Sequence, residues 1–132
     1  MINKYSFINI YEHKKKKSKL SSKILYGEKC TILKEYKDWY KIKTGYEKYV
    51  GFIRKKKFEK FAHKPTHKVS SLKANIFFKP SKNSKIKMKL SFASLLQVKS
   101  SYKNFLNFDN YWIQRSDVMP IDYREKIFKR IL

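Results

Sequence analysis

The sequence contains one order of short apolar segments and turns twice, and this repetition constrains the fold more than any other feature. The first copy spans residues 9–53 and the second spans residues 75–113. Each copy opens with an Asn-Ile-aromatic segment, passes through a loop rich in Lys and Ser, and continues with four further apolar segments. Alternation of apolar and polar residues, as in residues 39–43, is typical of half-buried strands. The sequence therefore predicts an all-β chain of two small five-stranded barrels in tandem.

The expected strands and loops follow the same pattern. In the first copy we predict a strand at 9–11, followed by a solvated loop that begins at Lys14 and continues through Ser18–Ser22. Four further strands are predicted at 25–28, 31–33, 39–42 and 49–53. In the second copy we predict strands at 75–77, 88–90, 95–98, 105–108 and 111–113, with a loop or tight hairpin at 107–110.

The same pattern predicts the domain boundaries. We expect a first domain at residues 1–58, a linker at 59–68, a second domain at 69–121 and a short basic helix at 122–132. Asp122 is a plausible N-cap for that helix, and apolar residues follow at spacing i, i+4. A unit of about 60 residues buries only about 60% of its unfolded surface, so each domain should lean on its neighbour.

The chain is strongly basic, with a net charge of +23. One interpretation is a polyanionic partner, such as a nucleic acid, an acidic membrane face or an anionic wall polymer. The other interpretation is a compositional bias, because 33 residues are basic but only four of them are Arg. Arg forms the better phosphate contacts, so its scarcity favours the compositional interpretation, and a nucleic-acid partner stays secondary.

No catalytic or metal-binding pattern is present in the sequence. Cys30 lies in a predicted strand and should point inward with Ile32, which favours a small buried hydrophobe over a nucleophile. His13, His63 and His67 lack metal-ligand spacing, so we expect no catalytic residue, no metal and no cofactor. We also expect no membrane span and a cytoplasmic protein, unless a longer precursor exists.

Four residues are candidates for ligand binding. Glu28 follows Gly27 at a predicted bend, and Tyr49 begins a strand; together they could receive an ammonium group, although a solvated Glu and a packed Tyr are the simpler interpretation. Trp39 and Trp112 could be ligand platforms or core side chains.

Several sequence blocks resemble the NlpC-type cell-wall peptidases. The blocks ILYGE, DWYKIK and YVGFI are similar to the first bacterial SH3-like domain of that family, and PTHKVSSLKANIFFKPS, residues 65–81, is similar to the start of the second. The resemblance implies two SH3-like barrels that precede a catalytic domain with a Cys nucleophile, which cleaves peptidoglycan stem peptides. It also implies that Glu28 and Tyr49 read the free amine of the peptide.

The Asp-Cys-Ser block of the family is missing, because the sequence ends where the first catalytic helix would begin. We therefore predict a non-catalytic binding or targeting module, whose partner is a cell-wall peptide or a catalytic NlpC-type domain. The alternatives are a basic nucleic-acid-binding protein of the small-barrel type and a truncated fragment of the active peptidase.

Overall fold

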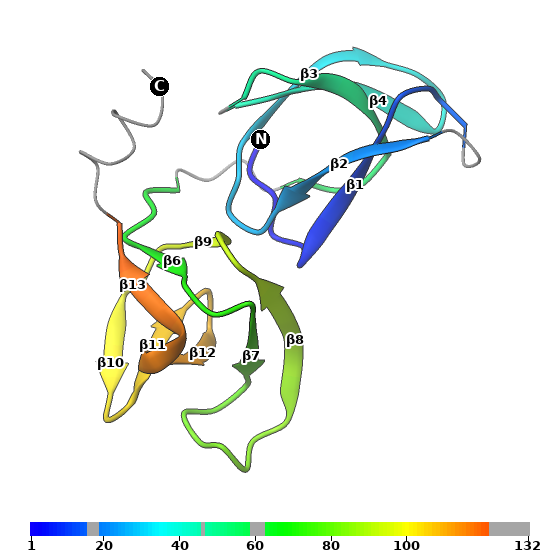
Figure 1. Ribbon diagram of the computed structural model, residues 1–132. Coiled ribbons are helices and arrows are strands. Elements are labelled where there is room, and N and C mark those ends of the chain that lie inside the picture. The colour runs from blue at the N-terminus through cyan, green and yellow to red at the C-terminus, as the bar shows by residue number, and fades with distance from the viewer. Residues whose placement is uncertain (16–18, 46, 59–62, 122–132) are drawn as a thin grey trace.

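The structure is a computed structural model that describes residues 1–15, 19–45, 47–58 and 63–121. Nearly all regular structure in these residues is antiparallel β-strand (Figure 1), which confirms the all-β prediction with two small units in tandem. The helix predicted at 122–132 lies outside the described residues.

The first unit is one curled five-stranded sheet in the order β2-β1-β5-β4-β3. Ile8 and Ile10 of β1 point inward with Ile42 and Ile53, because alternate side chains of a strand face opposite sides. The strands are β1 (Phe7–Tyr11), β2 (Leu20–Leu25), β3 (Cys30–Glu35), β4 (Trp39–Thr44) and β5 (Val50–Arg54).

The second strand of this unit differs from the prediction at both ends. β2 begins at Leu20, inside the expected loop, because its polar residues pair with β1 in the register Ile10–Ser22 and Tyr11–Leu20. It ends at Leu25 rather than continuing to Glu28, because Gly27 turns the chain at a φ of +83°.

The second unit combines a five-stranded and a three-stranded sheet, in the orders β10-β11-β12-β7-β8 and β13-β6-β9. Ile76, Leu90, Leu96, Phe108 and Ile113 are fully buried between them. The strands are β6 (His67–Val69), β7 (Lys73–Phe77), β8 (Ile86–Ser91), β9 (Leu95–Leu96), β10 (Ser100–Tyr102), β11 (Phe105–Phe108), β12 (Tyr111–Gln114) and β13 (Val118–Pro120), with a single 3₁₀ turn at Arg115–Asp117. β6 therefore begins two residues before the expected start of the second domain.

The hairpin between β11 and β12 is a two-residue turn at Asp109 and Asn110. Both residues have positive φ, 46° and 66°, and Phe108 pairs with Tyr111. This is the geometry that matches the twist of the flanking strands, and Asp and Asn tolerate it well. The turn reaches the first unit, where the Asp109 carboxylate contacts Lys4.

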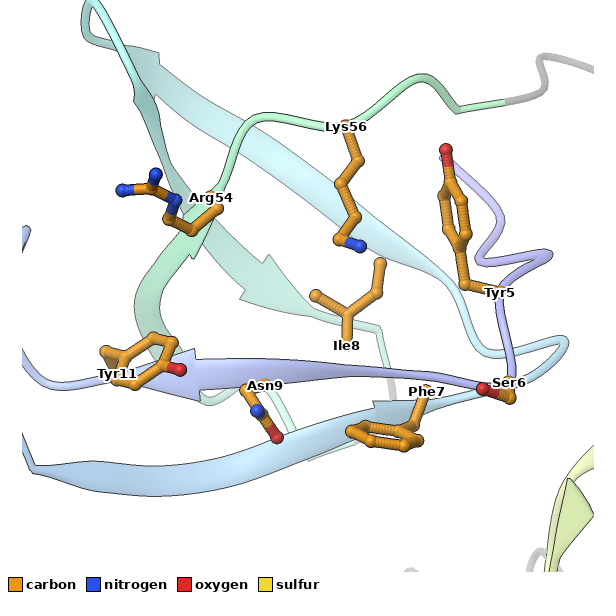
Figure 2. A pocket seen from close by; sticks show the side chains of 8 residues that line it. All are labelled: Tyr5, Ser6, Phe7, Ile8, Asn9, Tyr11, Arg54 and Lys56. Atoms are coloured by element: carbon orange, nitrogen blue, oxygen red, sulfur yellow. The ribbon is translucent and has the colours of Figure 1, made fainter. Parts of the chain in front are cut away.

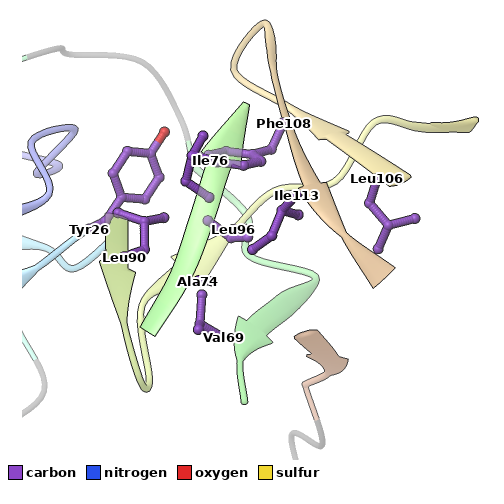
Figure 3. Packing of buried hydrophobic residues seen from close by; sticks show 9 residues of the cluster. All are labelled: Tyr26, Val69, Ala74, Ile76, Leu90, Leu96, Leu106, Phe108 and Ile113. Atoms are coloured by element: carbon purple, nitrogen blue, oxygen red, sulfur yellow. The ribbon is translucent and has the colours of Figure 1, made fainter. Parts of the chain in front are cut away.

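The two units share part of their interior. Tyr26, from the turn after β2, is 1% exposed and packs in the core of the second unit, edge-on to Phe108 (Figure 3). The backbone amide of Leu95 donates to the carbonyl oxygen of Tyr26 at 2.8 Å. Gly27 lies so close to Leu95 that a Cβ atom would sit 2.0 Å from its carbonyl oxygen. The second core is therefore completed by a side chain of the first unit.

Candidate ligand-binding site

A groove of about 320 Å³ lies on the first unit between β1 and the segment that continues from β5. Figure 2 shows Arg54 and Lys56 on one side of it and Tyr11 of β1 on the other. β1 and β5 pair only at Tyr11 and Phe52, so the strands diverge beyond that point and leave the space open. The groove is lined by Tyr5, Ser6, Phe7, Ile8, Asn9, Tyr11, Arg54 and Lys56.

One end of the groove is closed by a hydrogen bond across it. The Tyr5 hydroxyl donates to the backbone oxygen of Lys57 at 3.0 Å, which ties the start of the chain to the segment after β5. The Lys56 ammonium lies 4.6 Å from the centre of the Tyr5 ring. A cation held over an aromatic face is stabilised by the ring quadrupole and stays available on its solvent side.

Trp39 supports the other end of the groove from below. It is 7% exposed, and its ring meets the Tyr11 ring edge-on at 5.7 Å, while the Arg54 guanidinium lies 5.4 Å from its centre. Trp39 is thus a core side chain that positions two residues of the groove, rather than an exposed platform.

The other three predicted binding residues lie at separate places. Glu28 accepts a hydrogen bond from the Leu25 amide at 2.6 Å, so its carboxylate braces the turn that carries Tyr26. Tyr49 is half-buried against the core of the first unit, and its ring lies 3.2 Å from the position of a Cβ on Gly51. Trp112 is half-buried on β12 of the second unit, opposite Phe77.

Cys30 is 2% exposed and packs with Ile8 and Ile42, as the strand alternation predicts. Burial raises the pKa of its thiol, the opposite of what a nucleophilic thiolate needs. Within the described ranges, no group of three or more His, Cys, Asp or Glu side chains could hold a metal ion. The described part of the chain also has no helix that is long and apolar enough to cross a membrane.

A polar cluster joins the two units beside Tyr26. Lys4 donates to the Asp109 carboxylate at 2.7 Å and lies 3.2 Å from Nδ1 of His63, and the Tyr26 hydroxyl also donates to Asp109. Burial and the neighbouring Lys4 ammonium hold the pKa of His63 below its usual value. Burial alone would raise the pKa of Asp109, but the hydrogen bonds from Lys4 and Tyr26 outweigh it and lower that pKa. The cluster is therefore a neutral imidazole beside an ion pair.

No protein-family model and no curated protein matches the sequence. Among solved structures, an NlpC/P60 family protein from Bacillus cereus superposes with a TM-score of 0.73 at 15% identity, over 91% of this chain. The chain shares its fold with an NlpC/P60 family protein. It spans 55% of the length of that structure. NlpC2 from Trichomonas vaginalis matches over 89% of this chain and 46% of its own length at 14% identity, but its TM-score of 0.36 is too low to carry an argument.

Sequence reasoning did not select the groove residues, although a signal was present. Tyr5, Phe7 and Tyr11 alternate with Ile8 and Ile10, so an aromatic face runs along β1 opposite its core face. The exposed fractions of Tyr5 and Phe7 are 38% and 45%, so both rings face solvent. The segment with Arg54 and Lys56 faces these rings because β1 diverges from β5 beyond Tyr11. No local sequence pattern predicts this divergence.

Proposed function

We propose that this chain is a non-catalytic binding module that acts with an NlpC-type catalytic domain and binds a peptidoglycan stem peptide. The observation that supports it most is the fold shared with the Bacillus cereus NlpC/P60 family protein over 91% of this chain. Because the chain spans 55% of that structure, the remaining part of such a protein would supply the chemistry. The proposed compartment is the cytoplasm, which suits the single unpaired Cys30.

The proposal that the chain itself does not cleave peptides rests on the surroundings of Cys30. Its thiol is buried among aliphatic side chains, and burial raises its pKa. A cysteine nucleophile needs an accessible thiolate and a base beside it. Cys30 meets neither condition.

A direct test combines binding and turnover. The tripeptide L-Ala-γ-D-Glu-L-Lys is titrated into the pure chain by calorimetry, and its cleavage is followed by chromatography. We expect saturable binding and no cleavage. Absence of any binding would overturn the proposal, and so would cleavage that disappears in Cys30→Ala. The matched control is Cys30→Val, which keeps the site apolar and should bind the peptide as the parent chain does.

Nucleic-acid binding is a second candidate, because cations and rings also meet elsewhere on the first unit. The Lys14 and Lys34 ammonium groups lie 3.7 Å and 5.2 Å from the centre of the Tyr36 ring. Rings beside lysines can stack bases while the ammonium groups contact phosphates. If this surface only reflects composition, binding of an oligonucleotide should be weak and should collapse as salt is raised. Tight binding at physiological salt would place nucleic acid ahead of the peptide.

A further inference from the structure

We propose that the groove between β1 and the segment after β5 binds the free carboxylate of a short peptide, with Lys56 as its charge partner at the bridged end and Arg54, at the Tyr11 end, adding attraction over a longer distance. This proposal rests on the proposed function and adds which chemical group of the peptide is read, and where. It differs from the amine recognition that Glu28 and Tyr49 suggested from sequence, because the Glu28 carboxylate is engaged by the Leu25 amide.

The charges of the groove select an anion. Its two charged lining residues, Arg54 and Lys56, are both cationic, and no Asp or Glu lines it. Lys55, which lies between them in sequence, is instead 3.4 Å from the Glu35 carboxylate. In the described part of the chain, Arg54 and Lys56 have no carboxylate partner and lie over the rings of Trp39 and Tyr5. Lys56 at the bridged end is therefore suited to contact an incoming carboxylate, and Arg54 at the other end adds to the positive potential of the groove.

The shape of the groove favours a chain end over a continuous polymer. The Tyr5 hydroxyl bonded to the Lys57 oxygen bridges one end, and Lys56 lies beside that bridge. A nucleic acid or a long glycan must pass through its site and leave at both ends, whereas a terminal carboxylate can stop at the bridge. The volume of about 320 Å³ is at the small end of ligand pockets, roughly 300–1,000 Å³, which fits a short peptide.

The floor and walls supply contacts for the rest of the peptide. Ile8 lies at the floor with 2% exposure, and the rings of Tyr5 and Tyr11 stand at the two ends (Figure 2).

Trp39 offers a built-in reporter for the test. The chain has two tryptophans, so Trp112→Phe leaves Trp39, which contacts both Arg54 and Tyr11, as the single fluorophore. In this background, L-Ala-γ-D-Glu-L-Lys is titrated in its acid form and with both carboxylates converted to amides. Gly-Ala-Phe with a free carboxylate serves as a peptide unrelated to the cell wall.

We expect the acid form to change Trp39 fluorescence saturably, and the amidated form to bind about tenfold more weakly or worse, since a charge-assisted contact is lost. The double variant Arg54→Gln/Lys56→Gln should weaken the acid form by about tenfold or more. Lys56→Gln alone, at an exposed position that cannot affect the Trp39 packing, should weaken it severalfold. The control Lys87→Gln/Lys89→Gln removes the same charge from exposed positions of β8 and should leave the affinity within about twofold.

The outcomes separate this proposal from the proposed function. If the stem peptide binds but neither amidation nor the groove variants matter, the groove proposal is wrong and the proposed function stands. Equal weakening by the β8 control also overturns the groove proposal, because the effect is then general charge. If Gly-Ala-Phe binds as tightly as the stem peptide and depends on Arg54 and Lys56, the groove proposal stands and the cell-wall function is wrong. If no peptide binds, both are wrong.

Discussion

The two units have the same kind of sheet but use their aromatic residues differently. In the described residues, seven cation–aromatic contacts lie in the first unit and one, Lys103 over Tyr102, lies in the second. Both units also pair rings with one another, as in Tyr11 with Trp39 in the first and Phe77 with Phe105 in the second. The difference is that the rings of the first unit also lie beside cations, whereas those of the second lie mainly against other rings.

The difference extends to how each unit is completed. The core of the first unit is built from its own residues, whereas the core of the second includes Tyr26 from the first. A sequence repeat suggests two equal modules, but the packing makes them unequal. The following substitutions test that inequality, from the largest expected effect to the smallest.

Tyr26→Ala should destabilise the protein by about 3–5 kcal/mol, because it empties a large site in the second core. We expect Trp112, in the second unit, to report unfolding at lower denaturant than Trp39, in the first. Single-tryptophan variants measured in urea separate the two reports. Tyr102→Ala, at a position 51% exposed, is the matched control and should cost little. If both tryptophans shift equally, the units unfold as one and the proposed inequality is wrong.

Gly27→Ala should cost roughly 2–4 kcal/mol, through an unfavourable positive φ and a clash with the Leu95 oxygen. The damage should fall on the contact between the units, so calorimetry should resolve two transitions where the parent chain shows one. Gly45→Ala is the control, since its nearest neighbours would be 3.2 Å away and its φ is not in the left-handed region. Equal effects of the two substitutions would mean that the Gly27 contact does not join the units.

The sequence predicted much of the fold, because its signals there are local. Alternation located most strands and the inward Cys30, and residues 107–110 were predicted as a loop or tight hairpin, which the structure has at Asp109 and Asn110. The start of β2 at Leu20 was missed because Leu-Ser-Ser-Lys is extended only through its pairing with β1. The transfer of Tyr26 into the other core depends on how the units dock, which no local pattern records. The bond from the Leu25 amide to Glu28 is local, but the sequence at this bend is equally compatible with a solvated carboxylate.

Asp109→Asn should destabilise the protein by about 1–3 kcal/mol, because it removes the charge that accepts hydrogen bonds from Lys4 and Tyr26. Asn is suited to the positive φ of this turn, so the hairpin itself should survive. Asp117→Asn is the control, since that carboxylate accepts from the neutral Ser71 hydroxyl within the second unit. Urea titrations at pH 7 should show a larger loss of unfolding free energy for Asp109→Asn than for Asp117→Asn. The reverse order would mean that the charge cluster does not stabilise the contact between the units.

Acid should weaken the contact between the units in two steps. The pKa of His63 is lowered by burial and by Lys4, so the unfolded chain binds the proton more readily and stability falls as pH drops below about 6.5. The lowered pKa of Asp109 adds a second loss below about pH 4, when the unfolded carboxyl takes a proton before the folded one. Lys29 and the Leu95 carbonyl also face His63, with opposite effects on its pKa.

His63→Gln should flatten the stability profile between pH 6.5 and 5 and keep most of the loss below pH 4, because Lys4 and Tyr26 still lower the pKa of Asp109. A smaller loss should remain in the upper window, because burial also lowers the pKa of His67. His13→Gln, at an exposed position of the first unit, is the comparison variant that also removes one imidazole. The measurement is the urea midpoint at a series of pH values; an unaltered profile in His63→Gln would place the titrating group elsewhere.

The position of Tyr26 also orders events in time during synthesis of the chain. A ribosome delivers the first unit before the residues that will enclose Tyr26, and Phe108, its edge-on neighbour, follows 82 positions later. Until then the ring has only water or its own unit to contact. The first unit can form its own core during that time with Tyr26 exposed at one turn, because no described residue of the second unit is part of that core. The core of the second unit, in contrast, is complete only when Tyr26 has docked into it.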